Sequence, residues 1–241
     1  INEDDQVASV LQSMIWSCLM HMQANVSGAL DIVDDEYLHQ MRVALRRLRV
    51  ALNMAYRVQP DTELDGLRRD VAALTAVLGR TREWDVFVTQ TLLPVRKHFP
   101  HQAGIETILL GSEQMRKQHY LGLQTALQAQ EFQRLQLRFG VWMLGGYWNE
   151  ACWQEAGPLR LRSFAAQNLQ QRSEQVRKRY HKLTQPSALA SELHVFRIAC
   201  KKLRYCAELF APLYEGSGKK RYLSALVKLQ DTLGMMNDIA V

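Results

Sequence analysis

The sequence contains no hydrophobic run near the roughly 18 residues that a membrane-spanning helix needs, although 47% of its 241 residues are hydrophobic. It also shows no positively charged, then apolar leader before a cleavage site. We therefore expect a cytoplasmic protein with no membrane contact. The charged fraction of 22% is typical of a folded globular chain, so wholesale disorder is excluded.

The cysteines lack the CxxC spacing of redox and zinc motifs. Three of the four lie in apolar patterns typical of helices, which indicates reduced thiols packed in a core. The four are Cys18, Cys152, Cys200 and Cys206.

Alternating strand patterns are also missing, and apolar residues instead recur with helical spacing along most of the chain. We expect an all-α protein with helices at 7–30, 34–59, 61–78, 84–97, 105–130, 132–147, 159–183, 187–213 and 219–233. Gly79 and Gly234 are interpreted as glycines that end helices. Short connections favour antiparallel neighbours in bundles.

Two segments without any acidic residue carry most of the positive charge. Residues 39–49 read HQMRVALRRLR and residues 194–204 read HVFRIACKKLR; we call them the first and second basic segments. At about 100° per residue, His39, Arg42, Arg46 and Arg49 share a sector of about 80° on a helix. Met41, Ala44, Leu45, Leu48 and Leu52 form a separate apolar side. The eight Lys and Arg residues of these segments exceed the net charge of +6, so the basicity is local and typical of a site.

The two segments belong to a longer internal repeat. At one constant spacing without gaps, identical residues pair as His39/His194, Arg42/Arg197, Ala44/Ala199, Leu48/Leu203, Arg49/Arg204, Leu74/Leu229, Leu78/Leu233 and Gly79/Gly234. A duplication explains this pattern and predicts two pseudo-symmetric four-helix bundles whose basic segments face one shared surface. We predict repeats at 1–125 and 159–241, joined by a bridging segment at 126–158.

The motifs HQMRVALRRLR, LGRTREWDV, FRIACKKLRYCAELF and LQDTLGMMND resemble the CHAD domain, the histidine-containing α-helical domain. The resemblance covers residues 39–86 and 194–239. It departs from the family pattern at Glu83, where the family usually has Asp, and the charge is kept. The resemblance implies an all-α fold around a basic channel that binds inorganic polyphosphate, in some members beside a CYTH triphosphatase domain. The ligand-contacting candidates carried over by position are His39, Arg42, Arg46, Arg47, Arg49, His194, Arg197, Lys201, Lys202 and Arg204.

A linear polyphosphate presents repeated charges and no bases, so cations at regular spacing suit it. Arg offers forked donors and Lys a compact point charge. The simpler interpretation is a solvated helix face, with histidines that brace the helix start. The cations of the basic segments could also be structural, paired with Glu83, Asp85 or Asp238. Arg204 could pair with Glu208 four residues later.

The residues offer little support for a metal site, for catalysis or for nucleic-acid binding. Glu36 and His39 form an ExxH spacing used by di-iron bundles, but Ser191 replaces the glutamate in the repeat, so no metal is expected. We find no P-loop, HD pair or RHG motif, and so expect neither catalytic residues nor a cofactor. Nucleic acid would attract the same cations, yet the basic segments offer no aromatic residue for base stacking except Phe196, on the apolar side. Three alternatives stay open: a nucleic-acid-binding helical domain, an accessory domain of a triphosphate-hydrolysing enzyme, and a structural domain that docks an acidic protein.

Overall fold

The computed structural model describes residues 5–31, 34–149, 153, 160–185 and 190–240. Within these residues the regular structure is helical, with one isolated bridge between Gln6 and Arg160 and no strand. The all-α class predicted from the sequence is confirmed, whereas the internal duplication stays a prediction. The chain divides into two compact units, a larger one at 15–149 and a smaller one made of 1–14 and 150–241. The predicted division at 125/126 and 158/159 stays a prediction.

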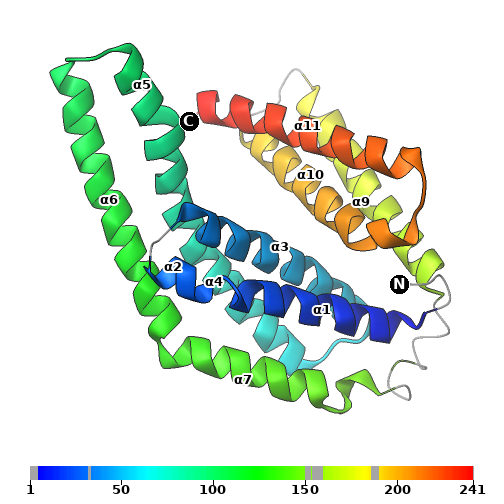
Figure 1. Ribbon diagram of the computed structural model, residues 1–241. Coiled ribbons are helices and arrows are strands. Elements are labelled where there is room, and N and C mark those ends of the chain that lie inside the picture. The colour runs from blue at the N-terminus through cyan, green and yellow to red at the C-terminus, as the bar shows by residue number, and fades with distance from the viewer. Residues whose placement is uncertain (1–4, 32–33, 150–152, 154–159, 186–189, 241) are drawn as a thin grey trace. The chain divides into compact units, whose positions relative to one another are not determined.

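The larger unit is a set of packed helices (Figure 1), in which α3 packs on α4 and α4 packs on α6. Its elements are α1 (Val7–Gln23), whose first turns belong to the smaller unit, α2 (Val26–Asp31), α3 (Asp35–Val58), α4 (Thr62–Val86), the π-helical turn η1 (Phe87–Leu92), α5 (Leu93–His98), α6 (Ala103–Gln128), α7 (Gln130–Leu144) and the 3-10 turn η2 (Gly146–Trp148).

Apolar spacing explains the helices of the larger unit. The apolar side chains that recur with helical spacing along α1 form one stripe and are all buried: Val7, Val10, Leu11, Met14, Ile15, Cys18, Leu19 and Met22. Acidic residues begin the next two long helices. The carboxylate of Asp34 accepts a hydrogen bond from the backbone N–H of Glu36 at 2.9 Å, and that of Asp61 accepts one from Leu64 at 2.9 Å. Both are N-caps that satisfy an otherwise orphaned donor.

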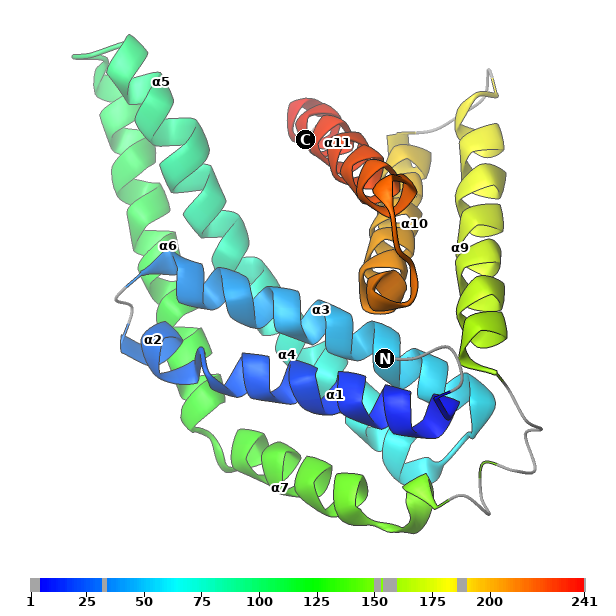
Figure 2. The same cartoon turned by 45° about the vertical axis from the view of Figure 1, so that its right-hand side comes forward.

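The predicted helix end at Gly79 is wrong. The helix α4 continues through this residue to Val86 and passes directly into η1 and α5, so the segments predicted at 61–78 and 84–97 form one continuous helical stretch. A glycine inside a helix costs only about 1 kcal/mol relative to alanine, which burial of the neighbouring Leu78 and Val88 can offset. After α5, the chain turns at His101, whose φ is 72°, and α6 returns beside α5 (Figure 2).

The smaller unit contains α9 (Leu161–Leu183), α10 (Ala190–Phe210), the 3-10 turn η3 (Ala211–Leu213) and α11 (Ser217–Ala240). The helix α10 packs against both α9 and α11. Its buried Phe196, Cys200 and Leu203 form the centre of the core, to which α9 adds Val176 and α11 adds Leu226 and Leu233. The helix end predicted at Gly234 is also wrong, because α11 continues to Ala240.

Three of the four cysteines are free, buried thiols: Cys18, Cys200 and Cys206. Burial raises the pKa of Cys18 and of Cys200 to about 11, which keeps both thiols protonated and poorly nucleophilic at neutral pH. The packed thiols predicted from the sequence are therefore confirmed for these three, and Cys152 lies outside the described residues.

Candidate functional site

The first basic segment occupies the first half of α3 and presents its two kinds of side chain on different sides. Met41, Ala44, Leu45, Leu48 and Leu52 are fully buried. The candidate ligand residues His39, Arg42, Arg46 and Arg47 are half-buried, and Arg49 is exposed. Burial of the apolar side holds the helix in one rotation about its axis, because turning it would expose those residues to water. The basic side therefore has a fixed direction within the larger unit.

Arg42 of α3 approaches the backbone of α4 closely at Gly79, the glycine of LGRTREWDV. A Cβ atom added to Gly79 would lie 3.0 Å from Nη1 of Arg42, tighter than ordinary van der Waals contact. The guanidinium of Arg42 thus lies against the bare backbone of α4. A side chain at position 79 would make this guanidinium shift by a few tenths of an ångström. The sequence pattern, which had suggested a helix end, did not reveal this contact.

A buried carboxylate joins α4 to α6 next to this contact. Asp85 is fully buried. Its Oδ1 accepts a hydrogen bond from Nε of Arg116 at 2.7 Å, and its Oδ2 accepts one from the hydroxyl of Tyr120, also at 2.7 Å. Burial, reinforced by Asp85, raises the pKa of Tyr120 far above its usual value. The two α6 donors account for both carboxylate oxygens, so the alternative in which Asp85 pairs with the basic segments is not what the structure shows.

Arg82 links this carboxylate to the start of α3. Its guanidinium donates to the carboxylate of Asp35, in the first turn of α3, and lies 3.9 Å from Asp85. Bonding to Arg82 lowers the pKa of Asp35. Sequence reasoning did not single out Arg82 as a functional residue. The signal was present in the REWD part of LGRTREWDV, where arginine and aspartate stand three residues apart and so share a helix face.

His39 is held as a neutral imidazole among cations. Burial lowers its pKa most; Glu36 opposes this shift, while Arg82, Arg46 and Arg42 add to it. A bound polyanion would act in the opposite direction, because negative charge favours the imidazolium. Glu36, the acid of the ExxH pair, accepts a hydrogen bond from the side chain of Gln40. No cluster of three His, Cys, Asp or Glu side chains fit to hold a metal ion occurs among the described residues.

The second basic segment lies on α10, in the smaller unit. His194 and Lys202 are exposed, and Arg197, Lys201 and Arg204 are half-buried. Nε of Arg197 is shielded from solvent and has no hydrogen-bond partner in the described part of the chain. Phe196, Cys200 and Leu203 point into the core, as the apolar pattern predicted.

Arg204 has the carboxylate partner that its sequence spacing predicted. Its Nε lies 2.9 Å from Oε1 of Glu208, one helical turn later, and its guanidinium lies 5.4 Å from the ring centroid of Tyr205. Both contacts hold the side chain along α10 and reduce its availability to a ligand. Of the two other structural partners predicted for the basic segments, Glu83 and Asp238, the structure tests only Glu83. Glu83 is exposed and makes no ion pair with the described residues, and the side chain of Asp238 is not described.

The structure thus places five candidates on α3 and five on α10, each set on a helix whose apolar side is buried. Their joint contact with one ligand stays a prediction. No helix in the described ranges is long and apolar enough to cross a membrane.

A family model and one solved structure indicate the same family. The family model described as CHAD domain matches residues 13–241. The crystal structure of the CHAD domain from the plant Ricinus communis is similar with a TM-score of 0.81 and 29% identity, covering 100% of this chain and 78% of that one. PptA from Streptomyces chartreusis is similar with a TM-score of 0.69, but at 14% identity, over 95% of this chain and 81% of that one, so it shows the fold alone. No curated protein matches. Since the family model spans almost the whole sequence and carries both basic segments, the chain belongs to the CHAD domain family.

Proposed function

We propose that this chain binds inorganic polyphosphate without turning it over, in a basic groove to which both basic segments contribute. The observation that supports this most is the arrangement on α3. Its basic segment contains no acidic residue, its apolar side is fully buried, and Arg42 lies against Gly79. Family membership supports the same function. The proposed contacts come from His39, Arg42, Arg46, Arg47 and Arg49 on α3, and from His194, Arg197, Lys201, Lys202 and Arg204 on α10.

The chemistry of these side chains suits a bare phosphate chain. Successive turns of a helix rise by about 5 Å, so one helix can contact several neighbouring phosphates. Guanidinium groups donate two parallel hydrogen bonds to non-bridging oxygens and keep their charge at any physiological pH. A bound polyanion would raise the pKa of His39, and the imidazole would then gain a second N–H donor on protonation. The binding energy of such a site comes from repeated contacts between cations and phosphates, and the ligand needs no bases.

Affinity measurements test the choice of ligand. The chain is titrated with long polyphosphate, triphosphate and single-stranded DNA at about 150 mM salt, where nonspecific phosphate contacts are weakened. We expect long polyphosphate to bind most tightly. Equal or tighter binding of DNA would favour a nucleic-acid-binding domain instead.

Paired substitutions test the shared groove. Replacing Arg42 and Arg46 by Ala, or Arg197 and Lys201 by Ala, should each weaken binding of long polyphosphate by well over tenfold, since each charged hydrogen bond lost costs about 1.5 to 3 kcal/mol. A silent pair would remove that helix from the site. A matched control replaces the exposed Lys97 and Lys117, which lie outside both segments.

Absence of turnover and cellular location complete the proposal. Incubation of polyphosphate or triphosphate with the purified chain and Mg²⁺ or Mn²⁺ should release no phosphate, and release would identify an enzyme.

We further propose that binding brings the protein to polyphosphate granules in the cytoplasm. Fluorescent fusions in cells with and without polyphosphate would decide this, because a diffuse pattern in both would contradict it.

A further inference from the structure

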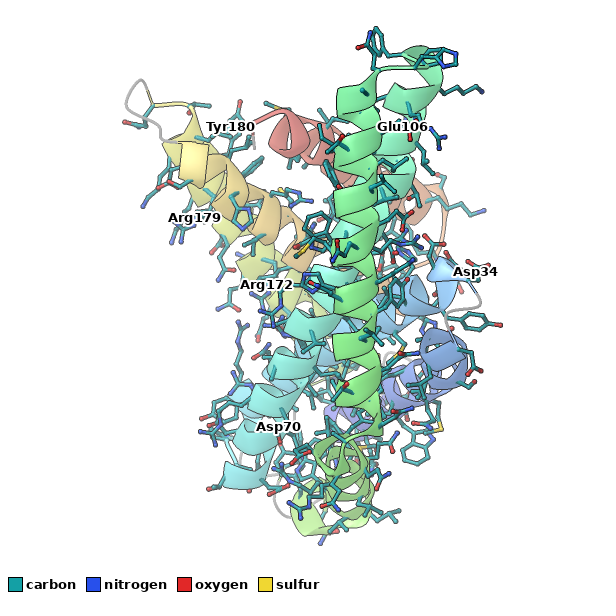
Figure 3. All side chains as sticks on the ribbon, turned by 90° about the vertical axis from the view of Figure 1, so that its left-hand side faces the viewer. Asp34, Asp70, Glu106, Arg172, Arg179 and Tyr180 are labelled. Carbon is teal, nitrogen blue, oxygen red and sulfur yellow. The ribbon has the colours of Figure 1, made fainter. Side chains whose placement is uncertain are left out.

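A second basic surface lies on α9, outside both basic segments. The last turns of this helix carry Arg177, Lys178, His181 and Lys182, all exposed, and we call them the α9 basic face. They share a sector of about 140° on the helix, opposite the core-facing Val176. Figure 3 shows Arg172, Arg179 and Tyr180 on the same helix. From Gln175 to Ser191 the sequence contains no acidic residue.

The α9 basic face lacks the carboxylate partners that neutralise surface arginines elsewhere. In the larger unit, Arg68 lies 3.0 Å from Asp65, Arg96 lies 2.7 Å from Glu106 and Arg138 lies 2.7 Å from Glu63. No described acidic side chain forms an ion pair with the α9 basic face. The acid one turn before it, Glu174, instead accepts a hydrogen bond from the amide of Gln170 at 3.1 Å. Arg177, Lys178 and Lys182 repel one another, and a bound anion would relieve this repulsion.

Helix stability alone does not explain the cluster. Cations in the last turn interact favourably with the helix dipole, which accounts for Lys182. Arg177 and Lys178 precede that turn, where the dipole effect has largely decayed. Together with Lys182 they form a positive surface with no acidic partner among the described side chains, which favours an anionic ligand.

The aromatic content of the α9 basic face argues against nucleic acid as this partner. Its neighbourhood offers one exposed aromatic ring, Tyr180. It is a single ring, with its centroid 6.1 Å from that of Phe196 and 6.2 Å from that of His181. Binding of single strands ordinarily uses several free rings on which successive bases stack. A linear anion without bases fits the surface better.

We propose that the α9 basic face is a second contact site for long polyphosphate, which gives the protein its preference for long chains. This inference rests on the proposed function of the two basic segments. A chain held by those segments keeps its free end at high local concentration near α9, so the second contact forms within the complex and raises the overall affinity. Triphosphate is too short to occupy both sites and gains nothing. Affinity therefore rises with chain length beyond what the basic segments alone can contact.

The test replaces Arg177, Lys178 and Lys182 by Ala and measures affinity for triphosphate and for polyphosphate of about 100 phosphates, a length able to reach two sites. We expect at least a tenfold loss for the long chain and no change for triphosphate. The slope of log affinity against log salt should also fall by about two to three for the long chain, one for each phosphate contact removed. A matched control replaces Lys97, Lys117 and Arg134, which are exposed and scattered over the larger unit, and should leave both affinities unchanged.

The outcomes separate this inference from the proposed function. If the α9 variant binds long polyphosphate like the parent while the Arg42/Arg46 variant does not, the second site is wrong and the basic segments stand. Equal losses for long chain and triphosphate, or a loss confined to single-stranded DNA, would likewise overturn it. If the parent chain binds no polyphosphate, both proposals fail. Charge reversal of Arg177 and Lys178 to Glu, checked by circular dichroism for an intact fold, should deepen the loss for the long chain alone.

Discussion

At the scale of single residues, Gly79 allows binding and stability to be separated. Replacing a glycine inside a helix by alanine stabilises the helix by up to about 1 kcal/mol, but the new methyl group would lie 3.0 Å from the guanidinium of Arg42. We predict that Gly79→Ala leaves the free energy of unfolding unchanged or raises it, while polyphosphate affinity falls severalfold as the guanidinium is displaced. Gly122→Ala is the control, because no atom lies within 4 Å of a Cβ at Gly122. Equal affinities for the two variants would show that Arg42 does not need this position.

His39 should make stability depend on pH. Burial lowers its pKa in the folded chain below the ordinary value of 6.5, so the unfolded chain binds more protons as the pH falls. The stability associated with neutral His39 is therefore complete above about pH 6.5 and decreases below it. Urea unfolding of the parent and of His39→Gln at pH 7.5 and pH 5.5 checks this. We expect the parent to lose more stability than the variant on acidification, and parallel losses would contradict the assignment to His39.

At the scale of elements, the apolar periodicity of the sequence predicted which side of each helix is buried better than it predicted where the helices end. Every apolar position of the α1 stripe and of the α3 apolar side proved buried, since burying a continuous stripe is what stabilises a helix in a globular protein. The ends at Gly79 and Gly234 were wrong, because a glycine can serve packing as well as helix termination. The bond from Arg82 to Asp35 and the α6 donors to Asp85 were missed for another reason. Their roles depend on contacts between helices that are distant in sequence, which no local spacing records.

The contacts of Asp85 predict a large cost for losing one carboxylate. Asp85→Ala leaves Arg116 and Tyr120 without their shared acceptor between α4 and α6. Removing one partner of a buried charged pair typically costs about 3 to 5 kcal/mol, so we expect a loss of this size in urea unfolding. Glu63→Ala is the control, because Glu63 forms a surface ion pair with Arg138 and such pairs contribute about 1 kcal/mol or less. Similar losses for the two variants would show that Asp85 does not hold α4 to α6.

At the scale of the whole molecule, the two basic segments belong to different compact units, so a ligand bound by both must act on both. The sequence repeat predicted two basic segments and their helices. It could not predict which rotation each helix adopts, because the packing of α3 on α4 and of α10 between α9 and α11 decides that.

Hydrogen exchange distinguishes one shared groove from two separate sites. A ligand stabilises the folded state by about 2.7 kcal/mol at a free concentration of 100 times its dissociation constant, and this slows amide exchange wherever opening requires its release. We predict that long polyphosphate protects the amides of both α3 and α10. In the Arg42→Ala/Arg46→Ala variant, protection of α10 should fall together with that of α3, because one bound chain supports both. If α10 keeps its full protection in that variant, each segment binds its own ligand, and the groove shared by the two helices is wrong.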